Sequence, residues 1–467
     1  MTVQDTKDPS GAIAEFVIGL RHDDIPDDVR LRAVHHMLDA TGIAMASATF
    51  DYSKITQTAI TGLGGSGEVP VLGTDKTLSP RDAATMNGFL VHGLDFDDTH
   101  IPGVIHPTAS AFPAALSAAY HVGATGRELV TAYIAGIEVS ARLGAVAKGG
   151  FHQVGFHPTG VVGIFGATAA AGKLMGLSAK QLRNALGAAL SMASGSLEFL
   201  EDGAWNKRLH PGWAAAAGLT AAALGKEGFE GISLPFTGRF GLYSAYLGPL
   251  ADSCDIALAT AGLGQEWELM NTAIKPFPAC HFTHGVIDAA IALRDQGATM
   301  DTIDHIKALV PQEVIKTVCE PEENKKRPAN GYDAQFSVPY LVATAIRNGR
   351  MTLTELEDPA LRDAQTLDLA ARVGYAADPG SAFPKAYSGE LIVTLKDGTT
   401  LRHREHINRG ADQRPLTNAE IVEKYDANAR VAVSPEVAQA TRDVILSLDS
   451  DRDIGAAMTG LTSARAA

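Results

Sequence analysis

The sequence is poor in cysteine and in positive charge. It has three cysteines in 467 residues, Cys254, Cys280 and Cys319, which are too few and too widely spaced for a disulfide framework or a cysteine-rich zinc site. Its 39 lysines and arginines are outnumbered by 53 aspartates and glutamates, which gives a net charge of −14 at pH 7. A surface of this sign repels nucleic acid and anionic membranes, so we expect neither as a partner.

Several recognisable segments are missing as well. No stretch of about 20 residues is free of polar residues and glycine, and the N-terminus has no basic-then-apolar signal pattern, which predicts a cytoplasmic protein. The sequence has no Gly-x-Gly-x-x-Gly after a predicted strand, no phosphate loop and no Gly-x-Ser-x-Gly elbow. We therefore expect no cofactor and no acyl-serine chemistry.

The first 270 residues, rich in alanine and glycine, repeat the periodicity of helices. After Pro26, apolar residues recur at i, i+3, i+4, i+7 and i+11 from Val34 to Met45, which is one face of a helix. The runs 109–120, 160–176 and 212–224 are nearly uncharged, and a helix without a polar face must be surrounded by others. This part of the chain predicts a large helical domain.

Strand patterns begin after residue 270. Ile306, Ala308 and Val310 alternate as in a half-buried strand, and 391–395 with 399–403 predict a hairpin. Its turn, Asp397-Gly398, is expected to supply the positive φ angles of a tight primed turn. Helical patterns occupy 282–294 and 337–348, and they return from 418 to 448.

The length of the chain suggests two or three domains. We expect a mainly α protein with an α+β second domain. A large all-helical domain is formed by both chain ends, 1–269 with 409–467, and a smaller α/β lid domain, 270–408, is inserted into it.

Candidate functional residues concentrate around histidines. Eight of the fifteen histidines fall within four of five short segments that also hold glycine, proline or a charged residue. They are His92, His100, His106, His152, His157, His210, His281 and His284.

The first segment, 92–107, offers three aspartates, Thr99 and His106 as bases and hydrogen-bond donors within one loop. A zinc or manganese site on Asp97, Asp98 and His100 is the alternative, although the sequence has no His-x-x-x-His on a helix. A solvated acidic loop is the third interpretation.

In the second segment, His157 and Thr159 open an apolar helix. The positive end of the helix dipole disfavours an imidazolium there, which predicts a neutral base or donor, and the free N–H groups offer an anion site. The alternative is a structural cap.

The remaining segments carry cations. Lys207, Arg208 and His210 form a patch suited to a carboxylate or phosphate, unless Glu201 and Asp202 merely balance it at the surface. Lys275 directly precedes two stiffening prolines, Pro276 and Pro278, at the expected domain junction, close in sequence to His281 and His284. The fifth segment, 333–340, is interpreted equally well as part of a functional site or as a helix entering the core.

These residues together suit the removal of a proton next to a carboxylate. Histidine and aspartate supply bases, and fixed cations such as Lys207 and Lys275 act where the negative charge of an enediolate-like intermediate develops. No bound metal is required for such chemistry.

The same segments resemble the MmgE/PrpD family. The resemblance rests on Asp95-Phe-Asp-Asp-Thr99 with His106-Pro107, Gly155-Phe-His157-Pro158, Lys207-Arg-Leu-His210, Lys275-Pro-Phe-Pro278 with His284, and Gln335-Phe-Ser337, in the family's order. It implies a mostly helical large domain, a smaller α/β lid, a homodimer and no cofactor.

Members of the family include 2-methylcitrate dehydratases, cis-aconitate decarboxylases and iminodisuccinate epimerases, which act on small di- or tricarboxylates. The functional positions of the decarboxylases correspond to Asp95, Thr99, His106, His157, Lys207 and Lys275. The decarboxylases' tyrosine would fall at 315–319, where this sequence has none. The dehydratases also differ, with an asparagine in the acidic motif and a Lys-Gly-Trp version of the third segment.

We therefore hypothesise a cofactor-independent epimerase of a small di- or tricarboxylate. His157 and either His106 or Lys207 are the acid and base, Asp95 orients a histidine, and Lys275 holds a carboxylate. The expected substrate contacts are Thr99, Arg208, His210 and His281. The alternatives are a 2-methylcitrate-type dehydratase, a cis-aconitate-type decarboxylase, a metal-dependent hydrolase and a non-catalytic carboxylate-binding protein.

Overall fold

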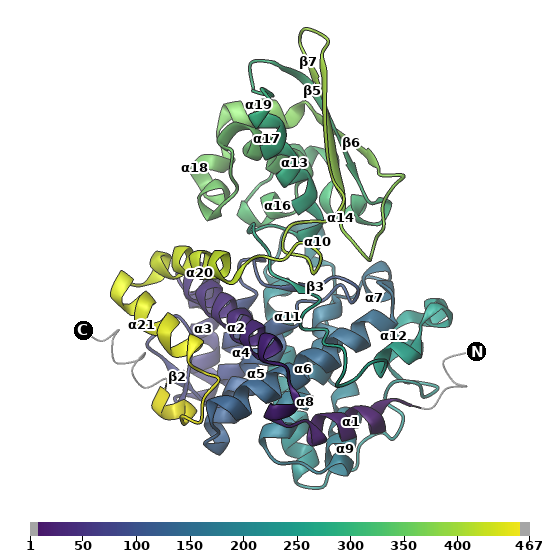
Figure 1. Cartoon of the computed structure of the whole chain (residues 1–467), viewed down its shortest axis with the longest axis vertical. Coiled ribbons are helices and arrows are strands. Elements are labelled where there is room, and N and C mark those ends of the chain that lie inside the picture. Colours follow the sequence, from purple (N-terminus) through teal and green to yellow (C-terminus); the bar gives the residue numbers. More distant parts are fainter. Residues whose placement is uncertain (1–7, 458–467) are drawn as a thin grey trace. The chain divides into compact units, whose positions relative to one another are not determined.

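The computed structural model describes residues 8–457, which divide into two compact units (Figure 1). The first takes the described residues of 1–199, 204–272 and 417–467, and the second takes 200–203 and 273–416. Both chain ends thus belong to one unit, which is mainly helical, and the second unit is α/β. The expected limits lay at 269 and 409, and residues 200–203 were not expected in the second unit.

The helices of the first unit account for most of its length. They are α1 (Ser10–Gly19), α2 (Asp27–Ser47), α3 (Asp51–Gly64), α4 (Pro80–Val91), α5 (Thr108–Val122), α6 (Gly126–Val146), α7 (Gly150–Gln153), α8 (Pro158–Leu174), α9 (Ala179–Leu190), α11 (Asn206–Lys226), α12 (Leu242–Leu247), α20 (Asn418–Ala432) and α21 (Pro435–Leu446). The 3₁₀ turns are η2 (His22–Asp24), η3 (Gly248–Ser253) and η4 (Ile256–Ala259), and α10 (Phe199–Asp202) straddles the two units.

This unit is not purely helical. Strands β1 (Val69–Pro70) and β2 (Thr77–Leu78) pair antiparallel, and β3 (Thr99–His100) lies in the loop before α5. The segment expected to be helical from 418 to 448 is two helices, because Ser434 caps a new helix whose first residue is Pro435.

The core of the first unit is built from apolar helices without a charged face. In α8 every residue from Pro158 to Gly172 is buried. Among the described residues α6 alone is long and apolar enough to cross a membrane, but 94% of that stretch is buried inside the protein. It is therefore packed as a core helix.

Small residues let two of these helices approach closely. Gly88 of α4 faces Gly212 of α11, and a Cβ atom on Gly88 would lie 2.6 Å from the Cα atom of Gly212. The same Cβ atom would lie 2.9 Å from the carbonyl oxygen of Ala109 in α5. This crossing sets the position of α11 beside the loop that follows α4.

The second unit holds a four-stranded sheet. Its strands are β5 (Ile303–Val310), β6 (Val373–Ala377), β7 (Gly389–Leu395) and β8 (Thr400–Glu405), in the order β6-β5-β7-β8. β5 and β6 are parallel, whereas β7 is antiparallel to β5 and β8. The predicted strand at 304–310 and the predicted hairpin are both present.

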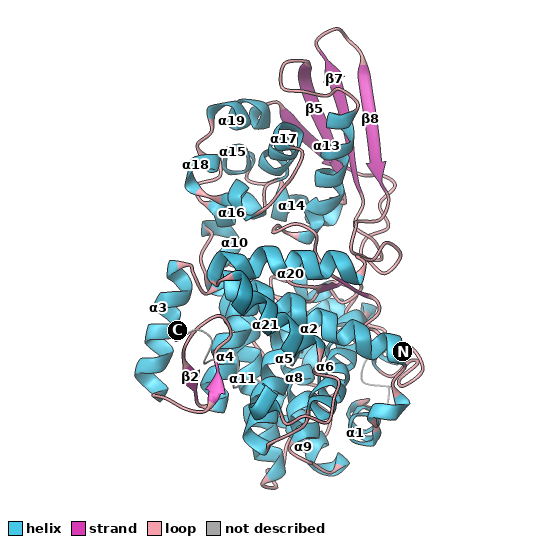
Figure 2. Cartoon of the chain, turned by 60° about the vertical axis from the view of Figure 1, so that its left-hand side comes forward, coloured by secondary structure: helices cyan, strands magenta, loops and turns pink. Residues whose placement is uncertain are grey.

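Helices α13, α17 and α19 lie on one face of this sheet (Figure 2). The helical elements of the unit are η5 (His281–Thr283), α13 (His284–Asp295), η6 (Gln312–Val314), α14 (Ile315–Val318), α15 (Glu322–Lys326), α16 (Gly331–Gln335), α17 (Val338–Asn348), η7 (Leu353–Leu356), α18 (Asp358–Leu361) and α19 (Ala364–Ala371). The two-residue strand β4 (Thr272–Ala273) straddles the units.

The hairpin turn differs from the expected type. Gly398 has a φ of 87°, but Asp397 is not among the residues with positive φ. The N–H of Gly398 donates to the carbonyl of Leu395 at 2.9 Å, so an ordinary tight turn is followed by one left-handed glycine. That arrangement matches the twist of the strands with a single positive φ, so a primed turn is not needed.

The helix crossing gives a stability test. Gly88→Ala places a Cβ atom against the backbone of α11 and is expected to lower the free energy of unfolding by about 1–3 kcal/mol, as overpacking does. Gly11→Ala in α1 is the control, because nothing lies within 4 Å of its Cβ position. Urea unfolding curves compare the two, and a Gly88→Ala protein as stable as the wild type would contradict the packing.

Candidate active site

The loop between α4 and α5, residues 92–107, has an unusual backbone. Asp95 and Val104 have φ angles of 51° and 53°, a region that residues with a side chain rarely adopt. Such conformations cost about 1–3 kcal/mol each and persist only where surrounding contacts hold them. The loop is therefore held in place by its neighbours.

Two residues of this loop point into the core. Asp98 accepts hydrogen bonds from Thr108 and lies 2.7 Å from Nδ1 of His36. His100 accepts the N–H of Gly103 at Nδ1, so its Nε2–H donates to Glu268 at 2.9 Å. Asp98 and His100 thus have different partners, and the structure does not bring together the three residues of the alternative metal site, Asp97, Asp98 and His100.

Other residues of the loop form a compact buried cluster. Nδ1 of His92 lies 2.8 Å from Oδ2 of Asp97, and Nζ of Lys207 donates to Oδ1 of Asp95 at 2.8 Å. Nε2 of His106 lies 4.0 Å from the same Asp95 oxygen. All five side chains are at least about nine-tenths buried. The predicted residues Asp95, His106 and Lys207 are therefore brought together.

The orientation of His106 is set by the backbone. Its Nδ1 lies 2.7 Å from the carbonyl oxygen of Asp98, which can only accept, so Nδ1 carries a proton. When His106 is neutral, Nε2 holds the lone pair on the side of Asp95. Thr99 Oγ1 lies 3.4 Å from Nδ1, and the hydroxyl of Thr159 accepts the N–H of His106 at 3.0 Å.

His157 joins the cluster from α8, where it is the N-cap residue as predicted. One nitrogen of each of His92, His106 and His157 lies within 4.8 Å of the other two. The Nδ1 atoms of His157 and His210 are 3.1 Å apart. Nε2 of His157 is buried and has no hydrogen-bond partner among the residues that the structure describes.

His157 and its neighbour His210 are held neutral mainly by burial. Burial, and then the charges of His210 and Lys207, lower the pKa of His157 well below its ordinary value. Burial and then Lys207 lower the pKa of His210 to about 4. The expected neutral state is thus supported, although the sequence argument attributed it to the helix dipole.

Arg208 joins α11 to the start of the loop. Its Nε–H donates to the carbonyl of Gly93 at 2.7 Å, and its guanidinium lies 4.2 Å from the ring centre of Tyr52. Neither Lys207 nor Arg208 is a surface charge, because both are buried. Whether Arg208 also contacts a substrate stays a prediction.

The C-terminal helix α20 holds the loop from another side. Nζ of Lys424 donates to Asp39 of α2 at 2.9 Å and to the carbonyl of Phe96 at 2.8 Å, between Asp95 and Asp97. Sequence reasoning missed Lys424, Asp39 and His36. No local pattern signals them, since Lys424 and Asp39 are 385 residues apart.

Lys275 and His281 are the two predicted residues that lie in the second unit. Lys275 is fully buried, and Asn408 Nδ2 donates to Nε2 of His281 at 2.6 Å. The rings of His281 and His284 are 4.6 Å apart. This unit therefore builds its own buried group around the predicted residues.

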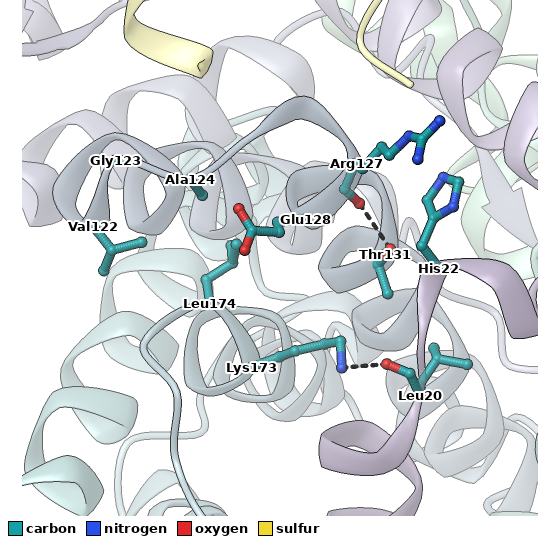
Figure 3. A pocket seen from close by; sticks show the side chains of 10 residues that line it. All are labelled: Leu20, His22, Val122, Gly123, Ala124, Arg127, Glu128, Thr131, Lys173 and Leu174. Atoms are coloured by element: carbon teal, nitrogen blue, oxygen red, sulfur yellow. Dashed lines mark hydrogen bonds between the residues drawn. The ribbon is translucent and has the colours of Figure 1, made fainter. Parts of the chain in front are cut away.

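A cavity of about 430 Å³ lies elsewhere in the first unit (Figure 3). It is lined by residues such as Arg127, Glu128 and Lys173, and by none of the predicted site residues. Nζ of Lys173 donates to the carbonyls of Val17 and Leu20, at the end of α1. The lysine thus caps a helix.

The cluster is not well suited to a divalent metal. His92, Asp95, Asp97 and His106 are close enough to share an ion. However, the ammonium of Lys207 already lies 2.8 Å from Asp95. It supplies a positive charge where a metal ion would lie, and repulsion opposes a second cation there.

The buried and half-buried histidines give a prediction of acid sensitivity. In the folded protein the pKa is lowered, chiefly by burial, for His35, His36, His152, His157 and His210. Below pH 6.5 these histidines become protonated in the unfolded chain but stay neutral in the folded protein. The free energy of unfolding therefore falls towards pH 4. Asp39 and Glu138, whose pKa burial raises to about 6 and about 7, oppose this trend but are fewer.

His152→Gln tests this sign, because burial lowers the pKa of His152 to about 4. The variant should lose less stability than the wild type between pH 7 and 5, by up to about 2 kcal/mol. Urea unfolding at the two pH values measures the difference, and equal losses would contradict it.

The hydrogen bonds of Lys424 to Asp39 and to the Phe96 carbonyl, here called the clamp, give a second prediction. Lys424→Met frees the Phe96 carbonyl and leaves Asp39 without its cation, so the loop shifts and turnover should fall at least about tenfold, as small misplacements do. Arg430→Met on the same helix is the control, because Arg430 is exposed. Steady-state kinetics compares them, and unchanged turnover in Lys424→Met would exclude the clamp.

Comparisons with known proteins identify the family of this chain. A family model of the MmgE/PrpD N-terminal domain matches residues 11–253, and one of the MmgE/PrpD C-terminal domain matches residues 277–450. Human cis-aconitate decarboxylase is 29% identical over 464 residues, which cover 95% of this chain and 92% of that protein. A cis-aconitate decarboxylase of Aspergillus terreus is 26% identical over 475 residues, 96% of each chain.

A 2-methylcitrate dehydratase of Escherichia coli K12 is 23% identical over 417 residues, 83% of each chain. The match to the family models extends over most of the sequence and includes all nine predicted site residues except Lys275, which precedes the second matched range. This chain belongs to the MmgE/PrpD family and is an enzyme of that type.

Proposed function

We propose that this enzyme removes a proton from the carbon next to a carboxylate of a small di- or tricarboxylate and returns a proton to the opposite face, an epimerisation without a cofactor. The observation that carries the proposal is the buried Nε2 of His157, which has no hydrogen-bond partner in the described part of the chain; its ring lies close to those of His92 and His106, and the charge of Lys207 acts on it.

His157 has the properties of the base in this mechanism. Its low pKa means that Nε2 is unprotonated at neutral pH whenever Nδ1 holds the ring proton. Taking the substrate proton at Nε2 leaves the C–H electron pair on the substrate, as an enediolate-like anion. A general base in this position contributes about 10²–10⁴ in rate.

The cations have the complementary role. Lys207 is held at 2.8 Å from Asp95, so its positive charge is fixed before the substrate binds. A preorganised charge stabilises the developing anion more than mobile water does. Within the first unit, Arg208 would bind a carboxylate with Thr99 as a further contact, and His106 or Lys207 would return the proton.

We favour epimerisation because this sequence differs from the decarboxylases and the dehydratases at positions that are typical of those enzymes. The segment 315–319 contains no tyrosine, where a decarboxylase is expected to have one, and the third segment is Lys-Arg-Leu-His. Decarboxylation is the second candidate, because the cis-aconitate decarboxylases align over nearly the whole chain.

Proton NMR in D₂O tests the proposal. EDTA-treated protein is mixed in turn with iminodisuccinate, cis-aconitate and 2-methylcitrate. Deuterium uptake with inversion at the α-carbon supports the epimerase, and release of CO₂ or water indicates a decarboxylase or dehydratase. An acid that is converted only before EDTA treatment would indicate a metal enzyme, and binding without exchange would indicate a binding protein.

His157→Gln is the decisive variant for the base. The exchange rate should fall by about 10²–10⁴, because the amide cannot accept the α-proton at neutral pH. His121→Gln, at an exposed position near the end of α5, is the control and should exchange like the wild type. Undiminished exchange in His157→Gln would rule out this assignment.

We further propose that the enzyme is a homodimer that uses the outer face of α11. Leu209, Trp213 and Leu224 are 40%, 52% and 37% exposed, and their spacing places them along one side of the helix. No charged residue occurs between Leu209 and Leu224. An uncharged apolar stripe can pair with its own copy across a two-fold axis, which supports a second copy as the partner.

Trp213→Asp should convert the dimer to a monomer, because each interface would then bury two carboxylates against apolar surface. Light scattering after size-exclusion chromatography measures the mass. Val431→Asp, 53% exposed on α20, is the control and should leave the mass unchanged. A monomeric wild type, or a Trp213→Asp protein with wild-type mass, would refute this surface.

A further inference from the structure

The ring of His210 contacts the ring of His157, the proposed base. Its Nδ1 lies 3.1 Å from Nδ1 of His157, with ring centres 5.2 Å apart. His157 is 3% exposed, whereas His210 is only partly buried. The pair therefore leads from the buried cluster towards the outside of the unit.

The fold builds this pair from three separate segments. The N–H of His157, at the start of α8, donates to the carbonyl of Gly195 at 2.9 Å. A Cβ atom on Gly195 would lie 3.3 Å from Nδ1 of His210, which comes from α11. The edge of Phe199 lies against the His157 ring. The two rings are thus held against each other by packing.

A contact between two Nδ1 atoms contains one proton. When both rings are neutral, one of them must donate and the other accept. If His157 donates, its Nε2 holds a lone pair and is a base. If His210 donates, Nε2 of His157 carries the proton and is an acid. The position of a single proton between the rings therefore decides what His157 can do.

We infer that His210 relays protons for His157. As Nε2 of His157 takes the substrate proton, the Nδ1 proton of His157 passes to Nδ1 of His210. His157 stays neutral with its proton now on Nε2, and the positive charge moves to His210, which can lose a proton to water from its own Nε2. Each ring gains and loses one proton over the cycle.

The relay explains how a histidine with a low pKa can act as a base. A lone imidazole that resists a positive charge would abstract a proton poorly. Passing the charge to the less buried ring lets His157 accept the α-proton without becoming an imidazolium next to Lys207. His210 thus acts through His157, which differs from its predicted role as a substrate contact. This inference rests on the proposed function.

The test uses solvent isotope effects on α-proton removal. In the wild type the solvent-exchangeable proton between His157 and His210 moves together with the substrate proton. For a substrate that carries ordinary hydrogen at the α-carbon, kcat/KM should therefore be lower in D₂O than in H₂O. In His210→Asn the amide oxygen can still accept from His157 but cannot hold a second proton. That variant should lose about 10²–10⁴ in kcat/KM, the range for a lost proton-transfer partner, and its solvent isotope effect should disappear.

A second variant and a check of folding distinguish a lost relay from a misfolded protein. His210→Gln repeats the change with a longer amide, and equal circular dichroism and unfolding curves show that both variants fold. If either folded variant retains the wild-type isotope effect, the relay is wrong while the proposed function stands. If the wild type removes no α-proton from any acid, the proposed function itself fails.

Discussion

The buried ion pair between Lys207 and Asp95 is the interaction on which the site depends. Removing two charges from water is costly unless their geometry is good and further hydrogen bonds satisfy them. Here the distance is 2.8 Å, and the pair lies among the histidines of the cluster. Burial is the main cause of the lowered pKa of His157 and His210, and the charge of Lys207 lowers both further. In the proposed mechanism the same positive charge therefore helps to keep the base neutral and stabilises the intermediate.

The rest of the first unit holds this pair in position. Asp95 lies on a backbone with positive φ, which persists because its neighbours are fixed. Asp98 is bonded to His36 of α2, and the Phe96 carbonyl to Lys424 of α20. Helices from the two ends of the chain thus converge on one loop. This arrangement explains why both termini belong to the unit that carries the cluster.

Much of this organisation could be predicted from the sequence, for identifiable reasons. Nearly uncharged runs such as 160–176 are expected to be buried helices, and strict alternation at 304–310 is expected to be a strand. His157 precedes a proline that begins a helix, so its N-cap position followed locally. Asp95 and Lys207 were each expected in the site from the family resemblance, but their ion pair was not predicted, because 112 residues separate them.

Other features could not be predicted, because they depend on contacts distant in sequence or on backbone angles. Asp97, Asp98 and His100 are near neighbours in the chain, yet they bind His92, His36 and Glu268 respectively. The turn at Asp397 uses one positive φ where two were expected.

The most direct test of the account is a titration of the ring nitrogens of His157 by ¹⁵N NMR, in the wild type and in Lys207→Met. The nitrogen shifts distinguish a neutral ring from an imidazolium. The account predicts that His157 stays neutral at the pH where a free imidazole becomes half protonated, and that its pKa rises once the lysine charge is gone. An imidazolium at neutral pH, or a pKa that does not respond to Lys207→Met, would contradict it.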